Sequence, residues 1–178
     1  IVDYFGNGQR WKVDIQYSVD NRPLGTAGTV KYALKYFKKD FLVLNGDTFF
    51  LKLNFSRLLE FHKQKKAEAT IAVTKEFQGR GGLIVADKDK RIKKFKEATD
   101  KKEVKEKGFN NAGAYIFNPK IFQSLKRGER ASLEKNLFPL LIKKNRRLFI
   151  YPIEKYIDIG SPESYKKACK FLSGEEEK

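Results

Sequence analysis

The feature that most constrains the fold is the stretch over residues 41–48, which reads Phe-Leu-Val-Leu-Asn-Gly-Asp-Thr. Its apolar residues form an unbroken run of strand length, which is typical of a buried strand in a largely parallel sheet. In open α/β sheets, ligands bind just beyond the carboxyl ends of the strands, so Asp47 is a candidate functional residue. The alternative is that Asn45, Gly46 and Asp47 form only a turn, because Asn-Gly and Gly-Asp pairs are common in turns.

Length and composition favour one compact domain. The chain has 178 residues, of which 40% are apolar, so it is long enough to build one core. We expect a single domain over residues 1–172 and a frayed tail over residues 173–178. The longest apolar runs are of strand length, so no segment is expected to span a membrane. The single cysteine, Cys169, excludes an internal disulfide and fits a reducing cytoplasm, where we place the protein.

The net charge of +16, with 38 basic and 22 acidic residues, suggests an anionic partner. The lysines, however, are spread over almost the whole chain and do not alternate with a ladder of aromatic residues. This distribution favours a solvated surface, and a nucleic-acid-binding module is the less favoured alternative.

A glycine-bearing loop over residues 21–29 precedes a helix that has apolar residues at helical spacing, from Val30 to Phe37. Small residues at a helix amino terminus allow backbone N–H groups to approach an anion or a flat base. The alternative is a plain helix entry. Before this loop, residues 13–19 alternate between apolar and polar, which predicts a half-exposed strand.

The remainder of the chain alternates between strand and helix patterns, so we expect a mixed α/β sandwich. His62 lies on the apolar face of one helix, where we expect a packed side chain without a catalytic role. Pro139 should kink or split the helix in which it falls. The expected elements are the end of a helix at 1–5, helices that begin near Phe55, after Asn118, after Ser132 and after Ser161, strands at 69–74, 113–117 and 148–153, a hairpin from 83–85 to 92–95, and a charged, mobile loop at 96–107.

Several short motifs carry a family resemblance. They are Pro-Leu-Gly-Thr-Ala-Gly at 23–28, Asn-Gly-Asp-Thr at 45–48, Phe-Lys-Glu at 95–97, Asn-Ala-Gly-Ala-Tyr at 111–115 and Tyr-Ile-Asp-Ile-Gly-Ser-Pro-Glu at 156–163. In this order the set resembles the sugar-1-phosphate nucleotidyltransferases, above all the guanylyltransferases that act on mannose 1-phosphate or heptose 1-phosphate. The resemblance implies a Rossmann-like, mixed but mostly parallel sheet sandwiched by helices.

The resemblance also implies an activity and a set of site residues. The enzyme would make GDP-mannose or GDP-heptose from a sugar 1-phosphate and a nucleoside triphosphate, with GTP favoured, and would release pyrophosphate. Asp47 and Asp158 would be catalytic and would bind Mg²⁺, a cation that commonly takes a few carboxylates together with phosphate oxygens and water. The resemblance places Leu24, Gly25 and Gly28 at the nucleotide, and Gly82, Glu97 and Asn111 at the sugar.

The sequence departs from this family at two places. Ala98 follows Glu97 where the family usually has a lysine for the sugar phosphate, and Lys101 or Lys102 is a candidate substitute. The family's glycine-rich phosphate loop does not occur, so we expect the chain to lack an N-terminal βαβ segment. A noncatalytic regulatory or scaffold relative is therefore an alternative function, and a homo-oligomer is an open possibility.

Overall fold

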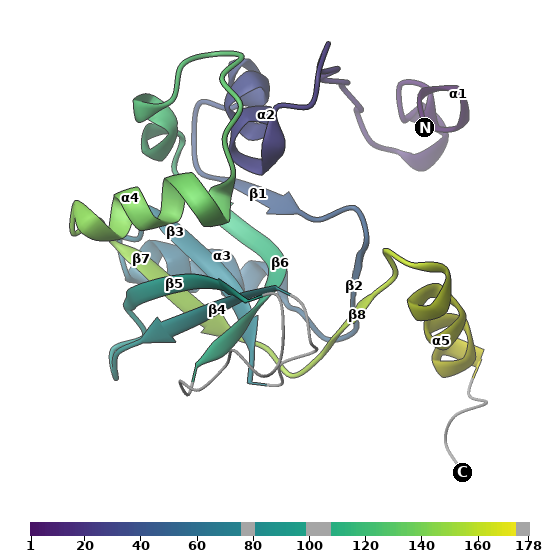
Figure 1. Cartoon of the computed structure of the whole chain (residues 1–178). Helices are drawn as coiled ribbons and strands as arrows, with labels where there is room; N and C mark the ends of the chain where they lie inside the picture. Colours follow the sequence, from purple (N-terminus) through teal and green to yellow (C-terminus); the bar gives the residue numbers. More distant parts are fainter. Residues whose placement is uncertain (76–80, 99–107, 174–178) are drawn as a thin grey trace.

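A computed structural model describes residues 1–75, 81–98 and 108–173, and it contains a six-stranded sheet (Figure 1). The long strand β6 pairs with β3 along one edge and with β4 and β1 along the other. Strand β5 pairs with β4, and β7 pairs with β3. The strands are β1 (Phe41–Leu44), β3 (Ala69–Thr74), β4 (Gly81–Ala86), β5 (Ile92–Ala98), β6 (Phe109–Phe117) and β7 (Leu148–Pro152).

The strand directions test the prediction of a mostly parallel sheet. Strands β1, β3, β4 and β7 run in one direction, while β5 and β6 run in the other. Because β6 is inserted among the strands of the first group, β3 with β7 is the only parallel pairing within the described sheet. The prediction of a mixed α/β fold sandwiched by helices is confirmed, and four of the six described strands run in one direction, although most adjacent strands are paired antiparallel.

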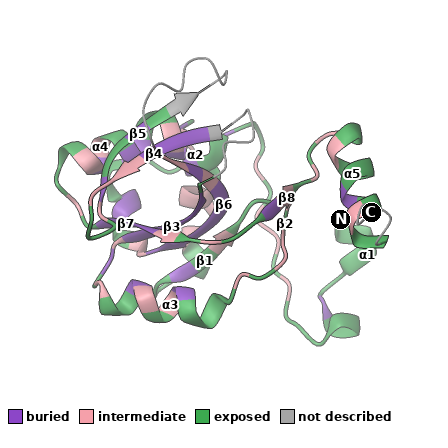
Figure 2. Ribbon diagram, turned by 90° about the horizontal axis from the view of Figure 1, so that it is seen from below, coloured by how far each residue is buried: buried purple, intermediate pink, exposed green. Residues whose placement is uncertain are grey.

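Helices cover both faces of the sheet (Figure 1). On one face, α2 (Gly25–Ala33), the π-helical turn η5 (Leu133–Leu137) and α4 (Phe138–Lys143) share a core with Ile71 and Val73 of β3. On the other face lies α3 (Phe55–Gln64), which contacts β3, β6 and β7. Figure 2 shows the buried residues concentrated on the strands between these layers. Shorter or outlying elements are α1 (Val2–Phe5), η1 (Gln9–Trp11), η2 (Leu34–Tyr36), η4 (Pro119–Ser124) and α5 (Pro162–Ser173).

A second, two-stranded sheet lies beside the main one (Figure 1). It consists of β2 (Thr48–Phe50) and β8 (Tyr156–Asp158), which are antiparallel. We call this pair the β2–β8 ribbon. Its register places Thr48 opposite Asp158 and Phe50 opposite Tyr156.

Helix starts that depend on local side chains were predicted correctly. The Asn54 side chain accepts a hydrogen bond from the Arg57 amide (3.0 Å) at the start of α3. The Ser132 hydroxyl accepts bonds from the two amides at 134 and 135, and the helix it opens is split into η5 and α4 just before Pro139. A missing N–H and a ring that crowds the preceding turn account for this break at proline.

His62 is a packed side chain, as expected. It is 1% exposed, and its Nδ1 lies 2.8 Å from the Thr70 hydroxyl of β3. Its Nε2 lies 3.5 Å from an Asp40 carboxylate oxygen, too far for a strong hydrogen bond. Burial therefore dominates and lowers the pKa of His62, although Asp40 opposes this shift.

Residues 13–19 do not form the predicted strand. Their alternating pattern suits a strand, but no neighbouring strand among the described residues pairs with them, and Val13 and Val19 are exposed. The segment is instead tied to the preceding turn, since the Tyr17 hydroxyl donates to the Gly6 carbonyl (2.6 Å). A period of two is therefore not sufficient for a strand without a partner edge.

Two further expectations need correction. Residues 96–98 belong to β5 instead of a loop, while residues 99–107 and 174–178 lie outside the described residues. In addition, β1 is only half buried, because Leu42 and Leu44 are 40% and 44% exposed. Within the described structure β1 pairs with β6 alone.

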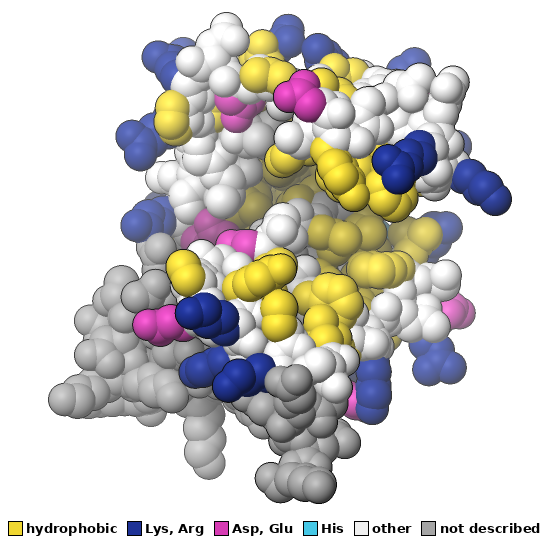
Figure 3. Space-filling model, turned by 90° about the vertical axis from the view of Figure 1, so that its right-hand side faces the viewer, with side chains coloured by type: hydrophobic (Ala, Val, Ile, Leu, Met, Phe, Trp, Pro, Cys, Tyr) yellow, Lys and Arg dark blue, Asp and Glu magenta, His cyan; other side chains and the backbone are white. Residues whose placement is uncertain are grey.

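Figure 3 shows hydrophobic side chains gathering on one side of the molecule, where they line a hollow.

Candidate functional site

The β2–β8 ribbon brings together the two candidate carboxylates, which lie far apart in the sequence. Asp47 immediately precedes β2 and Asp158 ends β8, with Thr48 of β2 directly opposite Asp158. The Ile159 amide donates to the Asp47 carbonyl (2.8 Å) and extends the pairing past the strand ends. The two acids are therefore near neighbours across one short antiparallel pair.

Gly160 shows how closely the carboxylates approach. A Cβ built on Gly160 would lie 2.9 Å from Oδ2 of Asp47 and 3.6 Å from Oδ1 of Asp158. Both carboxylates thus face the space that the missing side chain leaves free. Both residues are exposed, so both are accessible to a ligand from solvent.

Asp158 is oriented by the start of α5. Its Oδ1 accepts hydrogen bonds from the Gly160 amide (3.1 Å) and the Ser164 hydroxyl (3.2 Å). Ser164 also exchanges hydrogen bonds with Ser161, which caps the helix. Ser161 and Ser164 therefore begin the helix, and Ser164 also holds one carboxylate oxygen of Asp158.

Asn45 to Asp47 do form a turn, and that turn also delivers the acid. The Asn45 amide donates to the Gly113 carbonyl of β6 (2.8 Å). Gly113 has a φ of 78°, and a Cβ there would lie 2.6 Å from Nδ2 of the Asn45 side chain. Glycine is required here by both the backbone conformation and the contact. The turn and the functional interpretations of this motif are compatible.

The candidate nucleotide residues Leu24, Gly25 and Gly28 lie at the start of α2. The Ala27 and Gly28 amides both donate to the Ala131 carbonyl, at 2.9 Å and 3.0 Å, and the Ala131 amide donates to the Leu24 carbonyl. These two helix amides are thus already bonded inside the protein. The glycines are explained here by close packing against residues 129–131, which corresponds to the plain helix entry.

The candidate sugar residues lie on neighbouring strands at one end of the sheet. Gly82 of β4 is opposite Glu97 of β5, and Leu83 is opposite Asn110, which precedes Asn111 on β6. A Cβ on Gly82 would lie 2.3 Å from the Phe95 ring, so this ring requires a glycine. For Glu97 the structure describes the backbone position alone, and Lys101 and Lys102 lie outside the described residues.

Asn111 makes two structural hydrogen bonds. Its Nδ2 donates to the Tyr115 hydroxyl (2.8 Å), and its Oδ1 accepts from the Gly113 amide (3.1 Å). Burial raises the pKa of Tyr115, and the negative charges of Glu134 and Asp47 raise it further. Tyr115 therefore stays a neutral phenol, and the field of Asp47 extends to the strand that carries Asn111.

The carboxylate pair suits a divalent cation of the magnesium type. Within the described ranges, no group of three or more His, Cys, Asp and Glu side chains is arranged to hold a metal ion. Two carboxylates beside an open glycine match the few protein ligands that Mg²⁺ takes when phosphate oxygens and water complete its shell. Asp47 and Asp158 are thus the residues that would hold such an ion.

The sequence analysis identified both aspartates but did not predict the β2–β8 ribbon that brings them together. Strand β2 is three residues long and was not predicted, and neither was the role of Ser164. The sequence signal that could have predicted the ribbon is the high β-propensity of two short segments, Thr48 to Phe50 and Tyr156 to Ile157.

Comparisons with known proteins identify the family of this chain. A family model described as nucleotidyl transferase matches residues 1–175, and the chain belongs to this family. One relative is the D-glycero-alpha-D-manno-heptose 1-phosphate guanylyltransferase of Aneurinibacillus thermoaerophilus, 34% identical over 97% of this chain and 73% of its own length. Another is the mannose-1-phosphate guanyltransferase of Debaryomyces hansenii, 38% identical over 91% of this chain but only 43% of its own length.

Solved structures share the fold. HddC from Yersinia pseudotuberculosis, complexed with GMP-PN, has a TM-score of 0.75 and 26% identity over 96% of this chain and 72% of its own. A Bacillus anthracis structure with a TM-score of 0.79 and 18% identity shows the likeness of fold alone. No helix in the described part of the chain has the length and apolar character needed to cross a membrane.

Proposed function

We propose that this protein transfers a guanylyl group from GTP to a manno-configured sugar 1-phosphate, which gives a GDP-sugar and pyrophosphate. The observation that carries the proposal is the convergence of Asp47 and Asp158 beside Gly160. The relatives support the nucleotide and sugar classes, since they are named as mannose- and heptose-1-phosphate guanylyltransferases. We include a cytoplasmic location in the proposal, which the single, exposed Cys169 supports.

In this reaction an oxygen of the sugar phosphate attacks the α-phosphorus of GTP. The bond between that phosphorus and the bridging oxygen breaks, and the leaving oxygen carries the electron pair away with pyrophosphate. Several negative charges meet in the transition state, so the protein chiefly positions groups and neutralises charge. Bound Mg²⁺ would supply positive charge at the phosphate oxygens.

The residues of the chain have distinct parts in this proposal. Asp47 and Asp158 would hold the cation, with Ser164 keeping Asp158 in place. Gly82, Glu97 and Asn111 would lie at the sugar and Leu24, Gly25 and Gly28 at the base, as the family resemblance implies. The grouping of Gly82, Glu97 and Asn111 on β4, β5 and β6 supports the sugar assignment.

The test is pyrophosphate release by the protein in its natural length, with GTP compared against UTP and dTTP. We expect Asp47→Asn and Asp158→Asn each to lower kcat/KM by about 100-fold or more, because a positioned charge at the transition state is lost. Glu154→Gln is the matched control, since Glu154 is an exposed carboxylate beside β8 that contacts only Lys52 among the interactions described (3.2 Å). Its activity should remain at the wild-type level.

Gly160→Ala tests the geometry separately. The added methyl group would occupy the space beside the Asp47 carboxylate, so we expect a higher Mg²⁺ requirement without loss of the fold. Wild-type activity in both aspartate variants would refute the proposal, and turnover of UTP or dTTP faster than GTP would refute its choice of base. A complete absence of turnover with tight GTP binding would instead favour a noncatalytic relative.

A further inference from the structure

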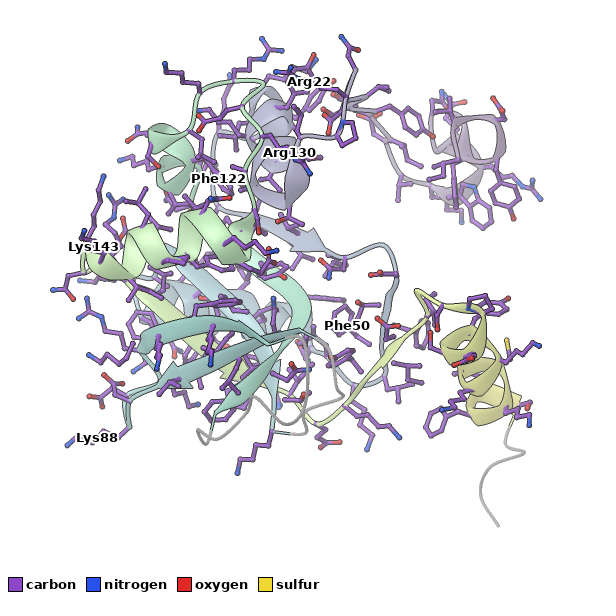
Figure 4. All side chains as sticks on the ribbon, in the orientation of Figure 1. Arg22, Phe50, Lys88, Phe122, Arg130 and Lys143 are labelled. Carbon is purple, nitrogen blue, oxygen red and sulfur yellow. The ribbon has the colours of Figure 1, made fainter. Side chains whose placement is uncertain are left out.

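Tyr156 attaches the β2–β8 ribbon to the main sheet. Its ring is 7% exposed and packs with Ala72 of β3 and with Ala112 and Ala114 of β6. Each of these alanines is at most 1% exposed. Because alanine side chains are short, they leave space above the sheet, and the aromatic ring of Tyr156 packs into this space. Phe50, the residue opposite Tyr156 and labelled in Figure 4, packs against the same cluster.

A buried hydrogen bond fixes this ring. Nδ2 of Asn110 on β6 donates to the Tyr156 hydroxyl (2.8 Å), and Asn110 is 1% exposed. Oδ1 of Asn110 has no hydrogen-bond partner within the described residues. Burying a side-chain amide is costly when its polar atoms are not hydrogen-bonded, so the bond from Nδ2 of Asn110 to Tyr156 is worth keeping. This bond favours the position of the ribbon in which the Tyr156 hydroxyl reaches Asn110.

The position of Tyr156 is transmitted to both carboxylates. Asp158 lies two residues further along β8, so the side chains of Tyr156 and Asp158 point to the same face of the ribbon. The register places Thr48 opposite Asp158, and the Ile159 amide, next to Asp158, donates to the carbonyl of Asp47. A two-stranded sheet of this length is barely stable in isolation and needs packing against the rest of the protein to keep its place.

We propose that Tyr156, held by Asn110, is a positioning residue for the carboxylate pair. Its role is indirect: through its contacts with the main sheet it sets where the ribbon places Asp47 and Asp158 relative to the sheet that carries the candidate sugar residues. This inference rests on the proposed function, because it assumes that the two carboxylates bind a divalent cation.

The test uses Tyr156→Phe in the protein of natural length, which keeps the ring and removes the hydroxyl. Mn²⁺ binding is followed by electron paramagnetic resonance in the presence of α,β-methylene-GTP, so that the readout does not require turnover. We expect the Mn²⁺ Kd to rise about 10- to 100-fold, the range found when partners outside the ligand shell are removed. Tyr151→Phe, which removes the hydroxyl of a tyrosine on β7 that packs on Phe61, should leave the Kd unchanged.

A double variant separates positioning from simple stability. Tyr156→Phe alone leaves the Asn110 amide without its partner, and Asn110→Leu in the same chain removes that buried polar group. We expect the double variant to regain thermal stability while Mn²⁺ binding stays weak. Recovery of both properties would overturn the inference, because the bond would then serve stability alone.

Asp158→Asn distinguishes failure of this inference from failure of the proposed function. If Asp158→Asn weakens Mn²⁺ binding and Tyr156→Phe does not, the positioning role is refuted and the carboxylate site stands. If neither change affects Mn²⁺ binding, the proposed function is refuted together with the inference. A rise of the Kd in both variants, with Tyr151→Phe unchanged, supports both.

Discussion

Replacement of Gly28 by alanine should destabilise the protein through a backbone clash. A Cβ on Gly28 would lie 2.4 Å from the Glu129 carbonyl oxygen, 3.1 Å from Cβ of Leu24 and 3.3 Å from the Ala131 nitrogen. Two of these atoms are backbone atoms of the segment that packs against α2. They cannot move aside by a change of rotamer, so the helix and the segment must separate.

The magnitude follows from two opposing effects. Overpacking in a tight site costs about 1–3 kcal/mol, and a backbone obstacle favours the upper end of that range. Alanine in place of glycine inside a helix returns about 1 kcal/mol. We therefore expect a net loss of about 2 kcal/mol in the free energy of unfolding. For a chain of this length, such a loss lowers Tm by about 4–8 °C.

Thermal denaturation followed by circular dichroism measures this effect, with Gly46→Ala as the control. A Cβ on Gly46 would meet nothing within 4 Å, so this variant should melt close to the wild-type temperature. GTP binding measured well below both melting temperatures then separates packing from a role at the nucleotide. If Gly28→Ala melts at or above the wild-type temperature, the contact of α2 with residues 129–131 is not as tight as described.

Two further predictions concern pH. Burial lowers the pKa of His62 from its ordinary value of 6.5, so its contribution to stability is complete above pH 6.5 and is lost as pH falls towards the folded-state pKa. Urea denaturation between pH 7.5 and about pH 5 should show a shallower loss in His62→Asn than in wild type. The hydrogen bonds from Arg146 lower the pKa of Glu68, so its contribution is present above the ordinary value of 4.5 and is lost as pH falls through the folded-state pKa. Glu68→Gln should lower stability by about 1 kcal/mol at pH 7 and by less at pH 3, and an equal effect at both would contradict this account.

Features set by a few neighbouring residues were predictable from the sequence. The side-chain oxygens of Asn54 and Ser132 cap helices by accepting hydrogen bonds from backbone amides two or three residues further along. Pro139 breaks a helix through its own ring. The hairpin of β4 and β5 also closes locally, through the turn at Asp87. In each case the deciding interaction lies within one window of sequence.

Features set by distant pairing were not predictable in the same way. The alternation of residues 13–19 and the apolar run of β1 are both strand-like, yet the former is not a strand and the latter is half exposed. A strand forms where a partner edge is available, and its burial depends on which layers cover it. The insertion of β6 between β3 and β1 likewise depends on contacts between residues far apart in the sequence.

The carboxylate pair lies between these two cases. Each acid was identified at the end of an apolar segment, but their convergence was an implication of the family resemblance, since nothing local relates Asp47 to Asp158. The structure supplies the link in the β2–β8 ribbon, whose strands are too short to give a strong periodic signal. Tyr156 of the ribbon packs against three alanines of the main sheet, and this contact is seen only in the folded chain. The placement of the site therefore depends on packing between the ribbon and the sheet, and a substitution at Tyr156 can disturb the site while both aspartates remain intact.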